Sequence, residues 1–354
     1  HELFYVLFGV LTVDNYIRWN LDHRIKNYAA SVIFFILALM SKETAVVLPA
    51  IILLTYLFTN KKRKLNFDVK AFLPYCFILG VYLYGHFVLY GIASGISYTL
   101  IFGKPTLNIL GWYFLWALST PNILIDFIGP GVKINPVFFQ VTQFQGILYF
   151  LFFPILVSIG LFLFLKTLRD YFTTADSSKF NIIILGLSWF IVGMIPLIIF
   201  PLHKLATEQA FSLVGLSLAL GYFLYQSFQS ATKYKILASL FIVIYLIIAI
   251  NSILLGRKTH WIVRSAQQVK NVISFIRNNY PQLSNDGRIY FRNGEVKIAP
   301  YGSSRQLYQA LGNGVGLKLI LEKPKINLYF EDLGQKPVKM DNLIIIDSSK
   351  LLGY

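Results

Sequence analysis

A serine and an adjacent lysine–glutamate pair separate two long apolar runs in the stretch Leu39-Met40-Ser41-Lys42-Glu43-Thr44-Ala45-Val46-Val47-Leu48-Pro49. The first run extends over residues 28–40 and the second over residues 44–58, and neither contains another charged residue. Burying a Lys or Glu in a bilayer costs about 2.5–3.5 kcal/mol on insertion scales, so such a pair must lie near an interface, be paired, or face a polar cavity. We therefore predict that Lys42 and Glu43 belong to a functional site.

A second interpretation of the same stretch needs no function. Short turns between helices carry charged pairs that simply remain in water. Ser41 also has the side chain of an N-cap for the helix that follows, with Glu43 in its first turn. The sequence leaves both interpretations open.

The composition identifies an integral membrane protein. Of the 354 residues, 56% are hydrophobic and 14% are charged, and the mean hydropathy is +0.61, whereas soluble domains contain about 25% charged residues. The chain begins inside an apolar pattern, residues 3–8, with neither a basic segment nor a cleavage site before it. We expect a fragment with further membrane helices upstream of His1.

The apolar segments predict a polytopic α-helical membrane protein with about eight spans, because roughly 17–25 apolar residues cross a bilayer and shorter segments need tilt or protein surroundings. The expected spans are Glu2–Val13, Asn27–Met40, Thr44–Phe58, Ala71–Tyr90, Gln145–Leu165, Asn181–Phe200, Glu208–Phe228 and Ile236–Leu255. A further segment, residues 107–128, is broken by Ser119-Thr120-Pro121-Asn122. A re-entrant or interface-lying pair of short helices explains this segment as well as a crossing does.

Loop charges predict the orientation of the spans. Four segments carry 13 Lys and Arg residues between them, namely 14–26, 59–70, 166–180 and 229–235. The opposite side carries single lysines, at Lys42, Lys104, Lys133 and Lys204. The basic set should be cytoplasmic, provided that residues 27–58 form two short crossings and residues 107–128 do not cross.

Residues 256–354 are predicted to form a small extracytoplasmic α/β domain after a membrane domain of residues 1–255. This part contains 15 Lys and Arg and 7 Asp and Glu residues. Apolar residues at helical spacing predict a helix over 259–279, and Ser303-Ser304-Arg305-Gln306 fits a capping box that opens a helix reaching Leu311. Short apolar runs typical of strands cover residues 288–291, 317–321, 327–330 and 343–346.

Several functional classes are disfavoured. The net charge of +16 arises mainly from short loops and from the last hundred residues, and Lys61-Lys62-Arg63-Lys64 is better explained as a membrane anchor than as a nucleic-acid patch. The single cysteine, Cys76, lies in an apolar run and gives neither a disulfide framework nor a thiolate metal site. Gly312-Asn313-Gly314-Val315-Gly316 is interpreted as an ordinary turn.

Two further charged groups share the predicted outer face with Lys42 and Glu43. His1 and Glu2 open a span from the outside. His203 and Lys204 lie in a turn between two spans, with Glu208 entering the next helix. Cations at an interface turn suit an anionic lipid head group or a lipid-linked phosphate. The alternative for His203 and Lys204 is a solvated turn, and the alternative for His1 and Glu2 is an incidental terminus. No metal ligands are predicted, and the sequence leaves open whether the protein requires a divalent metal.

Together these motifs resemble multispanning glycosyltransferases of the GT-C fold. The resemblance rests on the Ser41-Lys42-Glu43-Thr44-Ala45 turn with Leu48-Pro49, on His1-Glu2, on the basic cytoplasmic loop, and on His203-Lys204 and Glu208 before the helix that contains Gly215-Leu216-Ser217-Leu218-Ala219-Leu220. The nearest groups are those related to protein O-mannosyltransferases and the membrane regions of TMTC-type proteins. The resemblance covers roughly residues 1–255.

The resemblance implies transfer of a hexosyl or mannosyl sugar from a polyprenyl-phosphate donor to a glycan, lipid or protein acceptor outside the plasma membrane. The family's catalytic acidic residue lies in the first external loop, so the general base is expected upstream of His1. Lys42, His203 and Lys204 would stabilise the charge of the lipid-phosphate leaving group. Glu2 and Glu43 would orient these cations or bind sugar hydroxyls, and His1 and Glu208 belong to the same predicted donor-phosphate and substrate-binding set.

Two alternatives accompany this expectation. Trp112, Tyr113 and Trp116 are candidates for a sugar platform, but Trp and Tyr also form interface belts. The alternative function is a non-catalytic membrane carrier or scaffold for lipid-linked glycan or polysaccharide export. Transporters usually show matching halves with broken spans at equivalent positions, and no such match is found in this sequence.

The orientation can be tested with a topology reporter fused after residue 354. We expect the reporter to be extracytoplasmic, because the lysine-poor loops lie on the same side as the C-terminal segment. A cytoplasmic signal would mean that residues 107–128 cross the membrane or that residues 27–58 form one helix.

Overall fold

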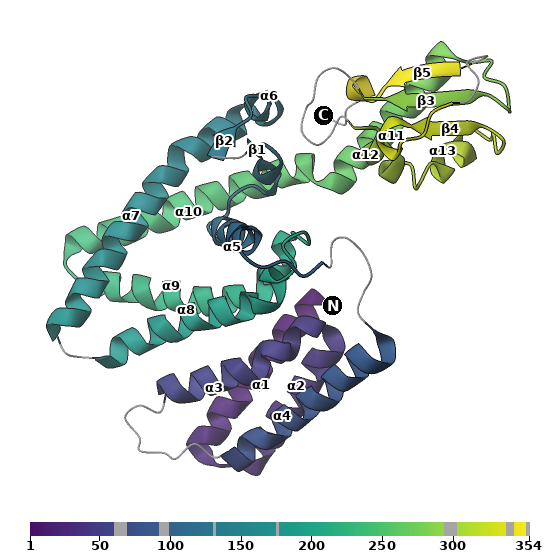
Figure 1. Cartoon of the computed structure of the whole chain (residues 1–354). Helices are drawn as coiled ribbons and strands as arrows, with labels where there is room; N and C mark the ends of the chain where they lie inside the picture. Colours follow the sequence, from purple (N-terminus) through teal and green to yellow (C-terminus); the bar gives the residue numbers. More distant parts are fainter. Residues whose placement is uncertain are drawn as a thin grey trace. The chain divides into compact units, whose positions relative to one another are not determined.

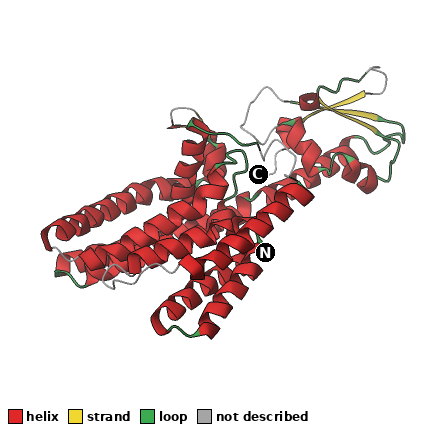
Figure 2. Ribbon diagram, turned by 60° about the horizontal axis from the view of Figure 1, so that its bottom comes forward, coloured by secondary structure: helices red, strands yellow, loops and turns green. Residues whose placement is uncertain are grey.

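The computed structural model describes residues 1–59, 69–91, 99–129, 132–174, 177–293, 303–337 and 343–351, and most of them are helical (Figures 1 and 2). Within these ranges, five helical stretches are long and apolar enough to cross a membrane. They are Val69–Leu89, Phe144–Phe172, Asn181–Ile198, Ala206–Phe228 and Thr232–Asn279. The helices support the predicted integral membrane protein.

Contacts divide the chain into two compact units. The first unit contains His1–Leu118 and Pro154–Tyr245, and the second contains Ser119–Phe153 and Leu246–Tyr354. The domains expected from composition, 1–255 and 256–354, differ from these units, because contacts also group 119–153 and 246–255 with the C-terminal sheet.

The elements of the first unit follow one another along the chain. They are α1 (Glu2–Asp22), α2 (Ile25–Ser41), the 3-10 turn η1 (Glu43–Val47), α3 (Leu48–Thr59), α4 (Val69–Tyr84) with its π-helical continuation η2 (Gly85–Tyr90), α5 (Lys104–Ala117), α8 (Ser177–Ile198), the 3-10 turn η6 (Ala206–Gln209) and α9 (Ala210–Phe228). Two more helices, α7 (Phe144–Thr174) and α10 (Thr232–Thr259), belong partly to each unit.

The helices extend beyond their apolar runs, so several predicted loops are shorter than expected. Residues 14–26 were expected to be a loop after Val13, but α1 continues to Asp22. In this extra part, Arg18 pairs with Asp14 at 2.8 Å one turn away, and Tyr16 is buried. An amphipathic end with an i,i+4 ion pair remains helical although its hydropathy is low.

The predicted break at Ser41–Glu43 is confirmed. α2 ends at Ser41, Lys42 is extended with φ −161°, and η1 begins at Glu43. The N-cap interpretation of Ser41 is wrong, because the Ser41 hydroxyl donates to the carbonyl of Leu37 one turn back in α2. The chain therefore leaves α2 through an extended residue and starts a new apolar helical segment.

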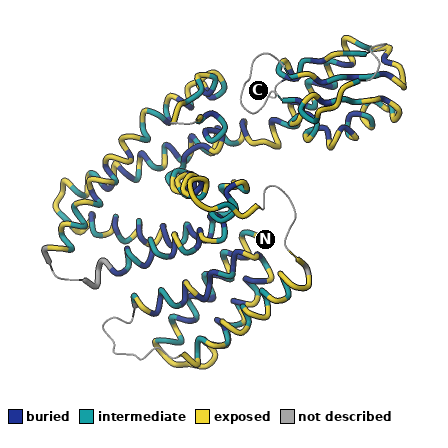
Figure 3. The backbone as a smooth tube through the Cα atoms, viewed as in Figure 1, coloured by how far each residue is buried: buried dark blue, intermediate teal, exposed yellow. Residues whose placement is uncertain are grey.

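Buried hydrogen bonds hold α1, α2 and α4 together. Ser31 Oγ on α2 donates to the carbonyl of Thr12 on α1 at 2.7 Å. The Tyr75 hydroxyl on α4 donates to Ser31 Oγ, also at 2.7 Å. Apart from Tyr75, α4 buries little of its surface (Figure 3), and its exposed apolar side chains suit contact with lipid.

Small residues bring α8 and α9 into close contact. A Cβ added to Gly186 on α8 would lie 2.5 Å from the carbonyl oxygen of Gly215 and 2.7 Å from the amide nitrogen of Ala219, both on α9. A Cβ added to Gly193 would overlap Ser212 Oγ on α9. Glycine, alanine and serine at helix interfaces allow this close backbone approach within membranes.

The segment 107–128 is broken as predicted. α5 has 14 residues, which gives it a length of about 21 Å, less than the roughly 30 Å of a bilayer core. It ends before Ser119, whose φ of 63° is left-handed. The short 3-10 turn η4 (Asn122–Asp126) follows Pro121.

The second unit contains an α/β part with a three-stranded parallel sheet in the order β4-β3-β5 (Figure 1). Its strands are β3 (Arg288–Arg292), β4 (Asn327–Phe330) and β5 (Leu343–Asp347), and its helices are α11 (Trp261–Asn279), α12 (Ser304–Ala310) and α13 (Val315–Ile320). The unit also contains the antiparallel pair β1 (Ile128–Gly129) and β2 (Lys133–Ile134), and α6 (Val137–Thr142).

Three of the four predicted strands are confirmed, and the strand over 317–321 is wrong. These residues lie mostly in α13, where Leu317 is fully buried and Leu319 is exposed. A short apolar run does not distinguish a strand from a buried helical turn. The predicted cap is confirmed in part, because Ser303 Oγ accepts a hydrogen bond of 3.3 Å from the Gln306 amide.

Alanine substitutions test the α8–α9 contact. Gly186→Ala should lower the unfolding free energy by about 1–3 kcal/mol, because its Cβ meets backbone atoms of α9. Gly221→Ala is the matched control on α9, where no atom lies within 4 Å of the added Cβ, and it should be neutral or stabilising. Thermal unfolding in detergent measures both; equal effects of the two changes would contradict the contact.

Candidate functional site

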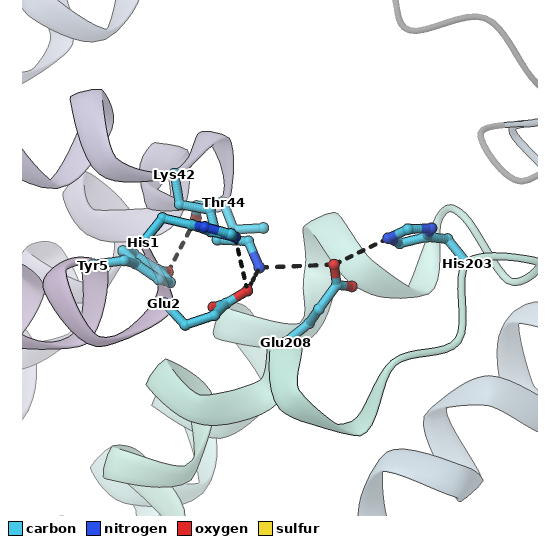
Figure 4. Close-up of polar contacts among 7 residues, drawn as sticks. All are labelled: His1, Glu2, Tyr5, Lys42, Thr44, His203 and Glu208. Atoms are coloured by element: carbon cyan, nitrogen blue, oxygen red, sulfur yellow. Dashed lines mark hydrogen bonds and ion pairs between the residues drawn. The ribbon is translucent and has the colours of Figure 1, made fainter. Parts of the chain in front are cut away.

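A buried lysine lies at the centre of the charged cluster, which we define as Glu2, Lys42, His203 and Glu208 (Figure 4). The Lys42 side chain is only 4% exposed. Its Nζ donates a hydrogen bond to Glu2 Oε1 and lies 3.7 Å from Glu208 Oε1. All four residues belong to the first unit.

One histidine of the charged cluster, His203, and a second histidine beside it, His1, lie on its more exposed side. His203 Nε2 lies 3.0 Å from Glu208 Oε1, and His1 Nε2 lies 3.9 Å from Glu2 Oε1. The side-chain exposure rises from Lys42 to 26% at His203 and 73% at His1. Each carboxylate thus faces the buried ammonium on one side and a more exposed imidazole on the other.

Local structure positions each charged side chain. Glu2 lies in the first turn of α1, Lys42 is the extended residue between α2 and η1, and Glu208 lies in η6 before α9. A carboxylate at the beginning of a helix interacts favourably with the helix dipole. The Tyr5 hydroxyl donates to the carbonyl of Thr44 at 3.2 Å, which holds η1 against α1.

The helices separate this cluster from the more basic end of the first unit. α1 places Glu2 and Asp22 at opposite ends of a 21-residue helix, about 31 Å apart. α9 similarly separates Glu208 from Ser230, which accepts a hydrogen bond from Lys166 Nζ at 2.6 Å. The predicted grouping of Glu2, Lys42 and His203 at one end agrees with this arrangement.

The balance of charge limits what Lys42 can bind. Two carboxylates surround one ammonium, so the group carries one net negative charge when the imidazoles are neutral. Lys42 already donates to Glu2. A phosphate would have to compete with both glutamates for this cation, whereas groups that donate hydrogen bonds would meet available carboxylate oxygens.

Besides His1, which lies at the edge of the charged cluster, two predicted site residues lie outside it. Glu43 is exposed on η1, and Lys204 is exposed in the turn that follows α8. Among the described residues, neither forms an ion pair with the charged cluster. Lys204 is therefore free to meet an anion from solvent, while His203 is the only one of the predicted turn cations that contacts Glu208.

Several buried polar atoms around the cluster have no hydrogen-bond partner within the described parts of the chain. They are Glu2 Oε2, Thr44 Oγ1 and Gln209 Oε1. Buried polar atoms are usually paired with protein, water or ligand. Thr44 and Gln209 were not predicted as site residues, although each is a sequence neighbour of a predicted glutamate.

The three aromatic residues of α5 that were predicted to form a sugar platform or an interface belt are buried. Trp112 and Trp116 are each 7% exposed and Tyr113 is completely buried. Burial raises the pKa of the Tyr113 phenol, and the negative charge of Glu208 raises it further. Tyr113 thus remains a neutral hydroxyl group close to Glu208.

Comparison of the chain with protein-family models, with curated proteins and with solved structures finds no match. A search of the described residues finds no group of three or more His, Cys, Asp or Glu side chains arranged to hold a metal ion.

Removal of the buried ammonium tests the cluster as a structural unit. Lys42→Ala should lower the unfolding free energy by about 3–5 kcal/mol, because it leaves two carboxylates without their buried counter-charge. Lys204→Ala is the matched control and should change it by at most about 0.5 kcal/mol, because this lysine is exposed. Denaturation in mixed detergent measures both variants.

A double variant sharpens this test. Adding Glu208→Gln to Lys42→Ala should recover part of the lost stability, because it removes one of two like charges. Strictly additive losses for the two substitutions would show that Lys42 and Glu208 do not interact.

Proposed function

We propose that this protein is a membrane glycosyltransferase of GT-C type that takes a sugar from a polyprenyl-phosphate donor and transfers it to an acceptor on the extracytoplasmic face. The observation that carries the proposal is the charged cluster, with its partnerless polar atoms, at the lysine-poor end of an apolar helical unit. The sequence motifs that resemble the GT-C enzymes supply the same residues.

The buried part of the charged cluster is suited to binding a sugar. Glu2 Oε2 and Gln209 Oε1 are acceptors without partners among the described residues, and sugar hydroxyls are donors. The neutral phenol of Tyr113 adds a group that donates or accepts. Lys42 has a positioning role in this proposal, because it holds Glu2 and faces Glu208.

The exposed turn that contains His203 and Lys204 is suited to binding the phosphate of the donor. His203 and Lys204 lie in the turn before η6, and both are more exposed than Lys42. Negative charge develops on the lipid phosphate as the sugar leaves, and positioned cations stabilise it in a site of low dielectric constant. The proposal gives these residues binding roles and assigns no general base among them.

The paired state of Lys42 favours a second candidate function. A buried network of ion pairs also links helices without any chemistry, as expected of a non-catalytic carrier or scaffold for a lipid-linked glycan. In that case, the charged cluster holds α1 and α9 together, and the exposed His203-Lys204 turn contacts lipid head groups.

A transfer assay separates the two functions. The protein in lipid vesicles is supplied with radiolabelled polyprenyl-phosphate sugars and a mixture of glycan, lipid and peptide acceptors. The wild type should transfer label, and His203→Ala should lower the rate by about 100-fold, because a charge-stabilising group is lost. Lys104→Ala, an exposed lysine predicted on the same side, is the control and should retain activity.

Two results would overturn different parts of the proposal. Full activity of His203→Ala would show that the turn has no role in transfer, while the transferase itself would stand. Movement of labelled lipid across the vesicle membrane, without transfer of label to an acceptor, would establish the carrier instead.

A further inference from the structure

The apolar surface of α10 ends a few residues before α11 begins. The exposed apolar residues in the last half of α10 are Leu246, Ile250, Ile253 and Leu254. As a helix, the apolar run 236–255 is about 30 Å long, which matches the hydrocarbon core of a bilayer. Residues 256–260 follow it and are polar, with Arg257 and Lys258 exposed. These residues therefore reach the level of the lipid head groups.

Three exposed apolar residues follow this polar segment. His260 has a non-helical ψ of 137°, so α10 ends at Thr259 and α11 starts as a separate helix. Its first residues, Trp261, Ile262 and Val263, are all exposed, and Trp261 is 59% exposed. We call these three residues the apolar turn. Exposure of such a turn to water is unfavourable, so its surroundings need an explanation.

The next residue of α11 fixes how the helix is turned about its axis. The Arg264 side chain is only 7% exposed, and its Nη2 lies 3.7 Å from Asp126 Oδ2 in η4. Gln268 and Val272 continue the same buried face at helical spacing. The side chains of the apolar turn therefore lie on the sides of α11 that its own unit leaves uncovered.

The exposed surface of α11 becomes polar after its first turn. Val263, Gln267 and Lys270 are exposed and lie on one face of the helix at successive turns. Only Val263 in this series is apolar. The apolar environment that α11 requires is therefore confined to the end of the helix that adjoins α10.

We propose that the apolar turn inserts into the boundary between lipid head groups and acyl chains, where Arg257 and Lys258 bind the phosphates of anionic phospholipids. The turn adjoins the exposed apolar surface of a helix that is long and apolar enough to cross a membrane. Tryptophan is enriched at this depth of a bilayer. Exposed basic residues beside a membrane helix attract anionic lipids.

This contact would anchor α11 to the membrane surface at its first turn. Of the five tryptophans in the chain, Trp261 alone is exposed, as the proposed contact with lipid requires. The inference holds whether or not the protein transfers sugars, so the two proposals can fail separately.

Spin labels on the full chain in phospholipid nanodiscs test the position of the apolar turn. The single native cysteine is first removed by Cys76→Ala. Labels are then attached to Val263→Cys and to the matched control Gln267→Cys, one turn further along the same face. Oxygen is concentrated in lipid and a nickel chelate in water. The ratio of oxygen to nickel accessibility should be several-fold higher at residue 263 than at residue 267.

Tryptophan fluorescence provides a second measurement without a label. The signal of Trp261 is the difference between wild type and Trp261→Phe, and lipids brominated near the head group should quench most of it. Adding phosphatidylglycerol to phosphatidylcholine nanodiscs should increase this quenching. The double variant Arg257→Gln and Lys258→Gln should lose the dependence on phosphatidylglycerol, because it has lost both cations.

Three outcomes would contradict the inference. Equal nickel accessibility at residues 263 and 267 would place the apolar turn in water. Protection of residue 263 from both reagents would show that protein covers the turn, whether a second copy or another segment of this chain. Quenching that does not depend on phosphatidylglycerol, or that depends on it equally in the double variant, would overturn the role of Arg257 and Lys258.

Discussion

A buried lysine ammonium in an apolar helical unit is the constraint on which the first unit depends. An ammonium removed from water loses its hydration, and only close counter-charges and hydrogen bonds offset that cost. Glu2 and Glu208 supply these charges to Lys42 from the N-terminal ends of two different helical segments. The start of α1, the link between α2 and η1, and the turn before α9 must therefore meet at one end of the unit.

Close packing between helices allows these three segments to come together at one end of the unit. Gly186 on α8 lies against Gly215 and Ala219 on α9, so these helices approach without intervening side chains. The ring of Phe211 on α9 packs on that of Tyr5 on α1, with centroids 4.8 Å apart. Apolar contacts thus bring α9 to α1, and the ion pairs of Lys42 fix the relation of their ends.

The same geometry defines the chemistry that is available. Lys42 is engaged by carboxylates, whereas acceptor oxygens of Glu2 and Gln209 have no partner among the described residues. The buried part of the cluster is therefore suited to groups that donate hydrogen bonds, and the more exposed His203-Lys204 turn is suited to anions. In the proposed function, Lys42 therefore positions the two glutamates, whereas the sequence had led us to expect that it binds the phosphate directly.

The sequence by itself determined the membrane class, most helices, the break at Ser41–Glu43 and three strands of the small sheet. These features depend on hydropathy and on backbone periodicity, which near neighbours along the chain control. It missed the helical end of α1, which an i,i+4 ion pair and the buried Tyr16 support. It also missed the helical state of 317–321, because a short apolar run takes its structure from tertiary packing. Only the tertiary structure decided that Lys42 pairs with Glu2, 40 residues away, while Glu43 and Lys204 stay exposed. A pair between residues so far apart in the sequence depends on how the helices pack, and local sequence patterns do not predict that packing.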